Sequence, residues 1–228
     1  FQIEKIAKIH HLKVIYDGAH AFGTKVNSVP IGNFGDMTMF SFHATKLFHT
    51  IEGGALAFKD ESLKAKLNLL KNFGIKNPEE VVLSGINAKM NEFQAAMGLE
   101  VLKLVEEERK KRKKLKQTYE KRLNHIEGVR IITNSEEEEN GYQYFVIEIN
   151  EEKYGKSRDD IYEELKKNNV FARKYFFPLC SNFEWYKENE SAKKENLPVA
   201  NEKIKQVLSL PFYGGLSEEV ALEIIDKL

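Results

Sequence analysis

Cysteine, net charge and long apolar runs are all scarce in this chain of 228 residues, and each scarcity excludes a class of protein. The single cysteine, Cys180, cannot form an internal disulfide, so we expect a reducing compartment such as the cytoplasm. Lysine plus arginine and aspartate plus glutamate number 35 each, and this balance argues against a nucleic-acid binder that works through bulk charge. No apolar run approaches a membrane span, and charges interrupt the N-terminal stretch where a signal peptide needs an apolar core.

What the chain does contain is the composition of a globular protein. It is 42% hydrophobic and 31% charged, and its length can bury a core as one large domain or two small ones. The sequence has no internal repeat and no low-complexity tract.

The first half of the chain has the pattern of an α/β fold. Apolar side chains at helical spacing predict a helix over residues 1–11, and short apolar runs at 13–16, 37–42 and 55–58 predict strands. A helix that leads into an apolar strand is typical of a mostly parallel sheet with helices. Ligands gather at the carboxyl ends of the strands in such sheets, and Asp17 stands at one of these ends.

Helical patterns follow the three predicted strands. An amphipathic helix over residues 60–73 should stop at Gly74, and the stretch 89–123, which has no proline and one glycine, predicts a long helix. The second half of that helix carries glutamates four residues before lysines and arginines. Such a run could form a nucleic-acid patch or a solvated face between two domains, and the zero net charge favours the solvated face.

The rest of the chain predicts a small α+β domain. Strands are expected at 129–132, 142–149 and 170–173, with an acidic loop at 134–141. Ser157 and Asp160 have the spacing of a capping box that opens a helix, and a closing helix should begin near Ser217. We therefore divide the chain into a large domain over residues 1–123 and a small domain over residues 124–228.

Four side chains near the ends of the first two predicted strands form an ordered set. His20 follows Asp17 by three residues and Lys46 follows it by 29, with Ser41 before the lysine and a Gly-Gly turn after it. This set suits an enzyme that uses pyridoxal phosphate (PLP), which needs an acid for its pyridine nitrogen, a lysine for the Schiff base and a hydroxyl for its phosphate. A lone strand-end aspartate or a lone lysine is commonly structural, so it is the combination that favours catalysis.

These motifs resemble those of the sugar-nucleotide aminotransferases of the DegT/StrS type, a branch of the fold type I PLP enzymes. The matching segments are DGAHA at 17–21, GD at 35–36, SFHATK at 41–46, EGG at 52–54, SGINAKMNEFQAAMG at 84–98, YFFPL at 175–179 and VLSLP at 207–211. Family members have a long segment before the equivalent of Asp17, whereas this chain opens at Phe1 without a methionine. The resemblance therefore implies the C-terminal part of such an enzyme, and we expect residues 1–228 by themselves to catalyse poorly.

The resemblance implies roles for five residues around the cofactor. Lys46 would form the Schiff base with PLP, and Asp17 would pair with the pyridine nitrogen and keep the ring cationic. These two are the expected catalytic residues. His20 would lie near the ring, and Ser41 would donate to the phosphate. Asn87 would reach across a dimer interface to the phosphate of the neighbouring subunit, which implies a homodimer with shared active sites.

Four further residues are candidates for substrate binding, and a structural role stays open for each. His43 could lie near the phosphate or substrate, or it could pack. Lys89 stands where family members commonly have arginine, and it keeps the charge but loses the bidentate fork. Arg173 and Tyr175 fall in a region that lies near the active-site mouth in the family, or they could belong to a packed strand. A zinc site is not expected, because no third local ligand joins His43 and His49.

The activity implied by the resemblance is transamination. An amino group would pass from an amino acid, glutamate by family analogy, to a keto group of a nucleotide-linked deoxysugar that serves polysaccharide or O-antigen biosynthesis. The amino-acid sequence of the motif around Lys46 most resembles members that act on 4-keto-6-deoxy sugars, and 3-keto substrates stay open. One alternative is a PLP-dependent sugar dehydratase, but there a histidine replaces the lysine that Lys46 provides. Another is a truncated, non-catalytic chain that only dimerises or binds a partner.

Overall fold

The computed structural model describes residues 2–133 and 138–228, and these divide into two compact units. The first unit holds residues 2–106 together with 138–143, and the second holds 107–133 together with 144–228. The division into domains at residues 123 and 124 stays a prediction. The fold is α/β, as expected from the sequence.

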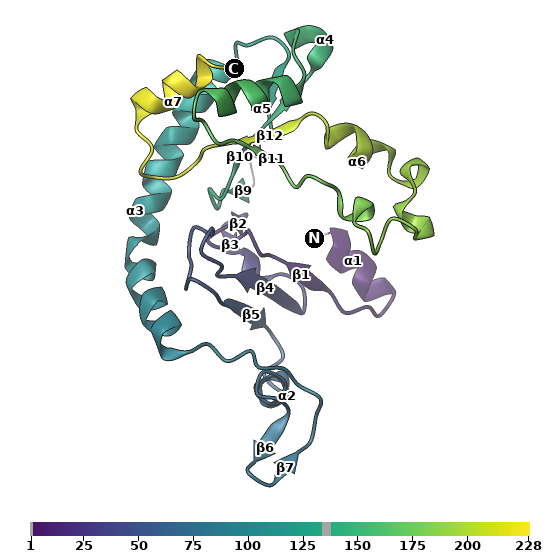
Figure 1. Cartoon of the computed structure of the whole chain (residues 1–228). Helices are drawn as coiled ribbons and strands as arrows, with labels where there is room; N and C mark the ends of the chain where they lie inside the picture. The colour runs from purple at the N-terminus through teal and green to yellow at the C-terminus, as the bar shows by residue number, and fades with distance from the viewer. Residues whose placement is uncertain (1, 134–137) are drawn as a thin grey trace. The chain divides into compact units, whose positions relative to one another are not determined.

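The first unit is built on a three-stranded sheet in the order β1-β4-β5 (Figure 1). Strand β1 (Ile15–Asp17) pairs in parallel with β4 (Met37–Ser41), and β5 (Gly54–Phe58) pairs antiparallel with β4. Helix α1 (Gln2–Ile9) precedes the sheet, and α2 (Leu63–Leu70) follows it. The predicted strands therefore form a sheet with one parallel pair and one antiparallel pair.

Gly18 permits the sharp turn that follows β1. It is buried, and its backbone nitrogen donates to the carbonyl oxygen of Met39 over 2.9 Å. A Cβ atom here would lie 2.9 Å from that same oxygen and 2.9 Å from Cγ2 of Thr38, closer than real Cβ contacts allow. The glycine after Asp17 is thus a packing requirement, and it holds the end of β1 tightly against β4.

Several short elements of the first unit have no clear sequence pattern. Strands β3 (Val29–Pro30), β2 (Lys25–Val26) and β9 (Glu138–Glu139) form a small sheet in that order, and β6 (Ile75–Asn77) pairs with β7 (Glu80–Val81). The expectation of a loop over 134–141 is wrong at Glu138–Glu139, because these two residues pair with β2. Residues 134–137 lie outside the described part of the chain.

The long helix α3 spans Glu92–Leu123, three residues short of the predicted start. Its beginning is set by a reciprocal cap, in which Asn91 Oδ1 accepts from the backbone of Gln94 over 2.9 Å and Gln94 Oε1 accepts from the backbone of Asn91 over 3.3 Å. The second half of α3 exposes charged side chains such as Lys110 and Lys111, as expected for a solvated face. Arg112 lies off that face: it is buried, and its Nε donates to Glu108 over 2.7 Å.

The second unit has an antiparallel sheet in the order β11-β12-β10-β8. Its strands are β8 (Val129–Ile131), β10 (Phe145–Ile149), β11 (Arg173–Lys174) and β12 (Val207–Leu210). The expected strand over 170–173 is wrong for its first three residues, since β11 begins at Arg173. Buried side chains from α3, the sheet and α5 form the core, among them Tyr119, Leu123, Ile147, Ile161, Leu165 and Leu208.

The helices of the second unit are α4 (Glu151–Tyr154), α5 (Arg158–Lys167), α6 (Pro198–Lys203) and α7 (Glu218–Ile225). The predicted capping box is confirmed at α5: Ser157 accepts from the backbone of Asp160, and Asp160 accepts from the backbone of Ser157. The closing helix also begins as expected, because the side chain of Ser217 caps α7.

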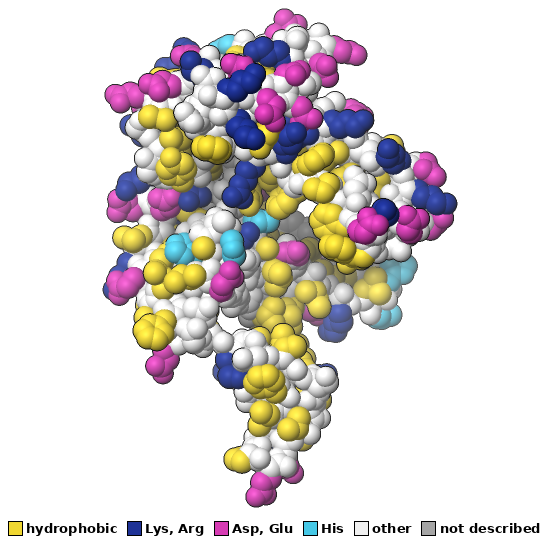
Figure 2. Space-filling view, viewed as in Figure 1, with side chains coloured by type: hydrophobic (Ala, Val, Ile, Leu, Met, Phe, Trp, Pro, Cys, Tyr) yellow, Lys and Arg dark blue, Asp and Glu magenta, His cyan; other side chains and the backbone are white. Residues whose placement is uncertain are grey.

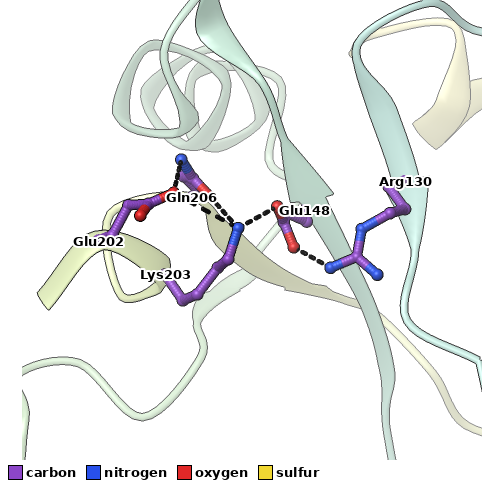
Figure 3. Close-up of polar contacts among 5 residues, drawn as sticks. All are labelled: Arg130, Glu148, Glu202, Lys203 and Gln206. Carbon is purple, nitrogen blue, oxygen red and sulfur yellow. Dashed lines mark hydrogen bonds and ion pairs between the residues drawn. The ribbon is translucent and has the colours of Figure 1, made fainter. Parts of the chain in front are cut away.

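Glu148 of β10 joins three elements of the second unit through its carboxylate (Figure 3). It pairs with Arg130 of β8, and it accepts from Nζ of Lys203 of α6 over 2.8 Å. Burial by itself would raise the pKa of this carboxyl, but the hydrogen bonds from Lys203 and Arg130 outweigh burial and hold the pKa below its ordinary value. The carboxylate therefore stabilises the folded unit.

Replacing Glu148 with glutamine should lower the free energy of unfolding by about 1 kcal/mol at neutral pH, because two cations lose the negative charge that they share. A depressed pKa contributes stability above the ordinary pKa of glutamate and loses it as pH falls through the folded-state pKa. The difference between the proteins should therefore shrink in acid. Urea unfolding at several pH values tests this, with the exposed Glu163→Gln as the control. An equal cost for both variants at all pH values would contradict the role of Glu148.

Candidate functional site

The two paired strands β1 and β4 deliver the charged residues of the candidate site. Asp17 is the last residue of β1, and His20 lies in the turn that follows it. Lys46 lies in a loop after β4, which closes where the backbone nitrogen of Thr50 donates to the carbonyl of Phe42 over 2.9 Å. A tighter turn inside this loop forms where the backbone nitrogen of Lys46 donates to the carbonyl of His43 over 2.9 Å.

Lys46 is half-buried, and its environment acts on its charge in two opposing ways. Burial lowers the pKa of the ammonium below its ordinary value, while the negative charge of Asp17 raises it, and burial is the larger effect. The structure therefore brings Lys46 and Asp17 within electrostatic reach of each other. A lysine with a lowered pKa has more neutral amine available at neutral pH, which is the form that attacks a carbonyl.

His20 belongs to the same charged group. Burial lowers the pKa of its imidazole, the positive charge of Lys46 lowers it further, and Asp17 opposes both effects. The net direction favours a neutral imidazole beside the lysine. Asp17 itself accepts from the backbone nitrogen of Ala19 over 3.0 Å, and this bond fixes the orientation of its carboxylate.

Ser41, the last residue of β4, contacts His43 at the start of the loop that carries Lys46. Oγ of Ser41 accepts from the backbone nitrogen of His43 over 3.3 Å. The ring of His43 contacts the side chain of Thr45 over 2.9 Å through Nδ1, and its Nε2 lies 3.6 Å from a carboxylate oxygen of Glu52. These contacts order the loop. A phosphate role for Ser41 and a substrate role for His43 stay predictions.

Asn87 and Lys89 lie on an exposed segment before α3. Nζ of Lys89 donates to Asn72 over 2.7 Å and to Asn87 over 3.1 Å, and it lies 4.8 Å from the centre of the Phe73 ring. Lys89 therefore orients the amide of Asn87. Neighbouring residues of this segment, Ala88 and Met90, line a groove of about 770 Å³ that also reaches Ser41 of β4.

Arg173 and Tyr175 belong to the second unit. Arg173 is exposed on β11, opposite Ser209 of β12. The ring of Tyr175 packs against Tyr144 at 5.5 Å and against Phe176 at 4.5 Å between centroids, and burial raises the pKa of its hydroxyl. All of these contacts join residues of the second unit and none involves a substrate group. A role in substrate binding therefore stays a prediction for both residues.

The residues that support the lysine loop could not be recognised from the sequence. Phe22 stacks on Phe48 at 4.6 Å, and Phe42 meets Phe48 edge-on at 4.7 Å. Gln143 contacts the backbone on both sides of Lys46. No local pattern marks these residues as partners, because Gln143 is far from Lys46 along the chain.

The donor set of this site fits PLP. Asp17 offers a carboxylate for a protonated pyridine nitrogen, Lys46 offers an amine with a lowered pKa, and Ser41 offers a hydroxyl to a phosphate. His20 adds an imidazole whose lowered pKa favours the neutral form, which can donate or accept. These are the groups that a covalently held pyridine cofactor requires.

Comparison with known proteins gives the family of the chain. The profile of the DegT/DnrJ/EryC1/StrS aminotransferase family matches residues 1–228, so the chain belongs to this family, whose members depend on PLP. It is 40% identical over 230 residues to the dTDP-4-amino-4,6-dideoxy-D-glucose transaminase of Escherichia coli. That alignment covers 100% of this chain and 61% of the relative, so our chain spans about three fifths of the length of the E. coli enzyme.

Solved structures agree with this assignment. DesI, solved in the presence of its TDP-sugar product, is 35% identical and superposes with a TM-score of 0.91 over 99% of this chain and 57% of its own. Spr1654 of Streptococcus pneumoniae, solved in its PLP form, is 26% identical with a TM-score of 0.85, covering 94% of this chain and 56% of its own. Among the helices that the structure describes in our chain, none has the length and apolar character that crossing a membrane requires.

Replacing Asp17 with asparagine should lower the pKa of Lys46 further, because the carboxylate is the charge that opposes the effect of burial. The neutral amine then predominates at lower pH, so Lys46 should be acylated at lower pH than in the wild type. Acylation of the cofactor-free protein, followed across pH by peptide mass mapping, measures this shift. Asp60→Asn, which removes an exposed acid after β5, is the control. A shift of Lys46 acylation to higher pH in Asp17→Asn would contradict the electrostatic interaction between Asp17 and Lys46.

Proposed function

We propose that this protein is a PLP-dependent aminotransferase that transfers an amino group from glutamate to a keto carbon of a nucleotide-linked deoxysugar. The observation that carries the proposal is the coupling of Asp17, His20 and Lys46 at the ends of two parallel strands. Membership of an aminotransferase family supports the same conclusion. The presence of Lys46 favours transamination over the dehydration catalysed by relatives that have histidine at this position.

The side chains divide the chemistry between them. Bound PLP supplies an electron sink that stabilises negative charge on a carbon next to nitrogen. Lys46 would hold the cofactor through Nζ, and its neutral amine, when free, would accept and return a proton. Asp17 would keep the pyridine nitrogen protonated by its negative charge. Ser41 would donate its hydroxyl to the phosphate, and His20 would lie near the ring.

The sugar substrate is proposed from the relatives. The E. coli relative is named for a 4-amino-4,6-dideoxy sugar on dTDP, and DesI was solved with a TDP-sugar product. We propose a 4-keto-6-deoxy sugar nucleotide as the acceptor. His43, Lys89, Arg173 and Tyr175 are the candidate contacts to this substrate. The reaction would take place in the cytoplasm and provide an amino sugar for polysaccharide biosynthesis.

A homodimer with shared active sites is part of the proposal. The segment around Asn87 carries exposed apolar side chains on both sides of the amide, including Ile86 at 69% and Phe93 at 89% exposure. Further exposed apolar side chains lie on the neighbouring part of the first unit that holds β6 and β7, among them Phe73, Val81 and Val82 (Figure 2). Such surface is costly in water, and a second copy of the chain would cover it. Asn87 would then meet the phosphate held by that copy.

Borohydride reduction of the PLP-loaded, full-length protein should leave a pyridoxyl label on Lys46. Lys46→Ala should lose both the label and transamination, because Lys46 is the lysine on whose pKa the charge of Asp17 acts. Peptide mapping after reduction makes the measurement, and Lys66→Ala, which removes an exposed lysine of α2, is the control. A label on any other lysine of the wild type would refute the assignment of Lys46.

Mixed dimers test the sharing of active sites. A Lys46→Ala subunit paired with an Asn87→Ala subunit keeps one intact site if Asn87 acts across the interface, so an equal mixture should regain about a quarter of wild-type activity. Lys46→Ala mixed with Asp17→Asn is the matched control, because both residues belong to the same subunit's site and neither site is then intact. Equal activity in the two mixtures, once heterodimers are verified, would show that Asn87 does not act in trans.

A further inference from the structure

Gln143 contacts the backbone on both sides of Lys46. Its Oε1 accepts from the backbone nitrogen of Leu47 over 2.8 Å, and its Nε2 donates to the carbonyl oxygen of Thr45 over 2.9 Å. A single side-chain amide therefore pairs with the two peptide groups that flank the lysine, much as a neighbouring strand would. Both bonds have the length of good hydrogen bonds.

Gln143 is the last residue of the segment 138–143, which belongs to the first unit. At its other end Glu139 pairs with Lys25, over 3.2 Å between the charged atoms and through the β2–β9 ladder. In between, a Cβ atom on Gly141 would lie 2.6 Å from Oγ1 of Thr24 and 3.1 Å from the carbonyl oxygen of Phe22. The segment thus packs closely on residues 22–25, which follow His20, and ends on the loop that carries Lys46.

We propose that Gln143 is a positioning residue that holds Lys46 in register with Asp17 and His20. The expected effect on catalysis rests on the proposed function, since it concerns the lysine that would hold PLP. The effect on the position of Lys46 rests only on the two hydrogen bonds and on the packing of residues 138–143 against residues 22–25 and the lysine loop. No local sequence pattern links Gln143 to Lys46.

The energetic reason lies in how the lysine loop is anchored. Leu47 and Phe48 are buried and pack with Val105 of α3, so apolar contacts already hold the loop on the core. Apolar contacts are not directional, and they leave the peptide groups on either side of Lys46 able to rotate. Two hydrogen bonds to one rigid amide remove that freedom. Loss of Gln143 should therefore change the orientation and solvation of Lys46 more than the stability of the fold.

The test compares Gln143→Ala and Gln143→Met with the wild type in the full-length protein. Methionine keeps the length of the side chain but makes neither hydrogen bond. Lys25→Ala is the control, because it removes the ion pair with Glu139 at the other end of the segment and leaves the amide in place. The first readout is acylation of Lys46 by acetic anhydride in the cofactor-free protein across pH, with the exposed Lys66 as the reference for reagent reactivity.

Both Gln143 variants should shift acylation of Lys46 to higher pH, because a looser loop admits water and relieves the burial that lowers its pKa. Lys25→Ala should leave the profile unchanged. The second readout is kcat for transamination, which should fall roughly 10- to 100-fold in both Gln143 variants with the KM for the amino donor unchanged.

Two results would overturn the proposal. One is a wild-type acylation profile in both variants, and the other is a wild-type profile in Gln143→Met alone, which would assign the effect to side-chain volume. A shifted profile in a protein that never binds PLP would support the role of Gln143 and refute the proposed function. The acylation readout therefore separates the two claims.

Discussion

The parallel pairing of β1 with β4 is the interaction on which the candidate site depends. The register places Asp17 opposite Met39, so both strands run towards the same edge of the sheet and their following loops leave from it. The close approach of Gly18 to Met39 keeps the two strand ends together. Asp17 and Lys46, far apart in sequence, interact because of this pairing.

The balance of charge at Lys46 follows from that placement. An exposed lysine would remain protonated at neutral pH, and a buried lysine without an acid nearby would lose its charge altogether. Lys46 lies between these limits, since burial lowers its pKa and Asp17 opposes the change. A lysine that must both hold a carbonyl compound and move protons needs such an intermediate state. The phenylalanines beneath the loop and the amide of Gln143 maintain the partial burial.

The longer elements could be predicted from the sequence because their signals are local. The short apolar runs that end near Asp17 and Ser41 predicted the two strands, and the capping box at Ser157 predicted the start of α5. The two-residue strands β2 and β9 could not be predicted, because their pairing depends on chain segments far apart in sequence. The burial of Arg112 was missed for a similar reason: its partner Glu108 also binds the backbone of Gly214, which no helical pattern reveals.

Some residues of the candidate site could likewise be predicted from the sequence and others could not. Asp17, Ser41 and Lys46 stand in recognisable motifs, whereas Gln143 has no motif and is found only through its hydrogen bonds. The proposed role of Lys46, beside Asp17, is to hold PLP. The most direct measurement is an absorbance scan between about 330 and 430 nm of the full-length protein titrated with PLP, beside Lys46→Ala. We predict that the wild type shows a saturable absorbance band at a longer wavelength than free PLP and that Lys46→Ala lacks this band. Identical spectra for the two proteins would contradict the proposed role of Lys46.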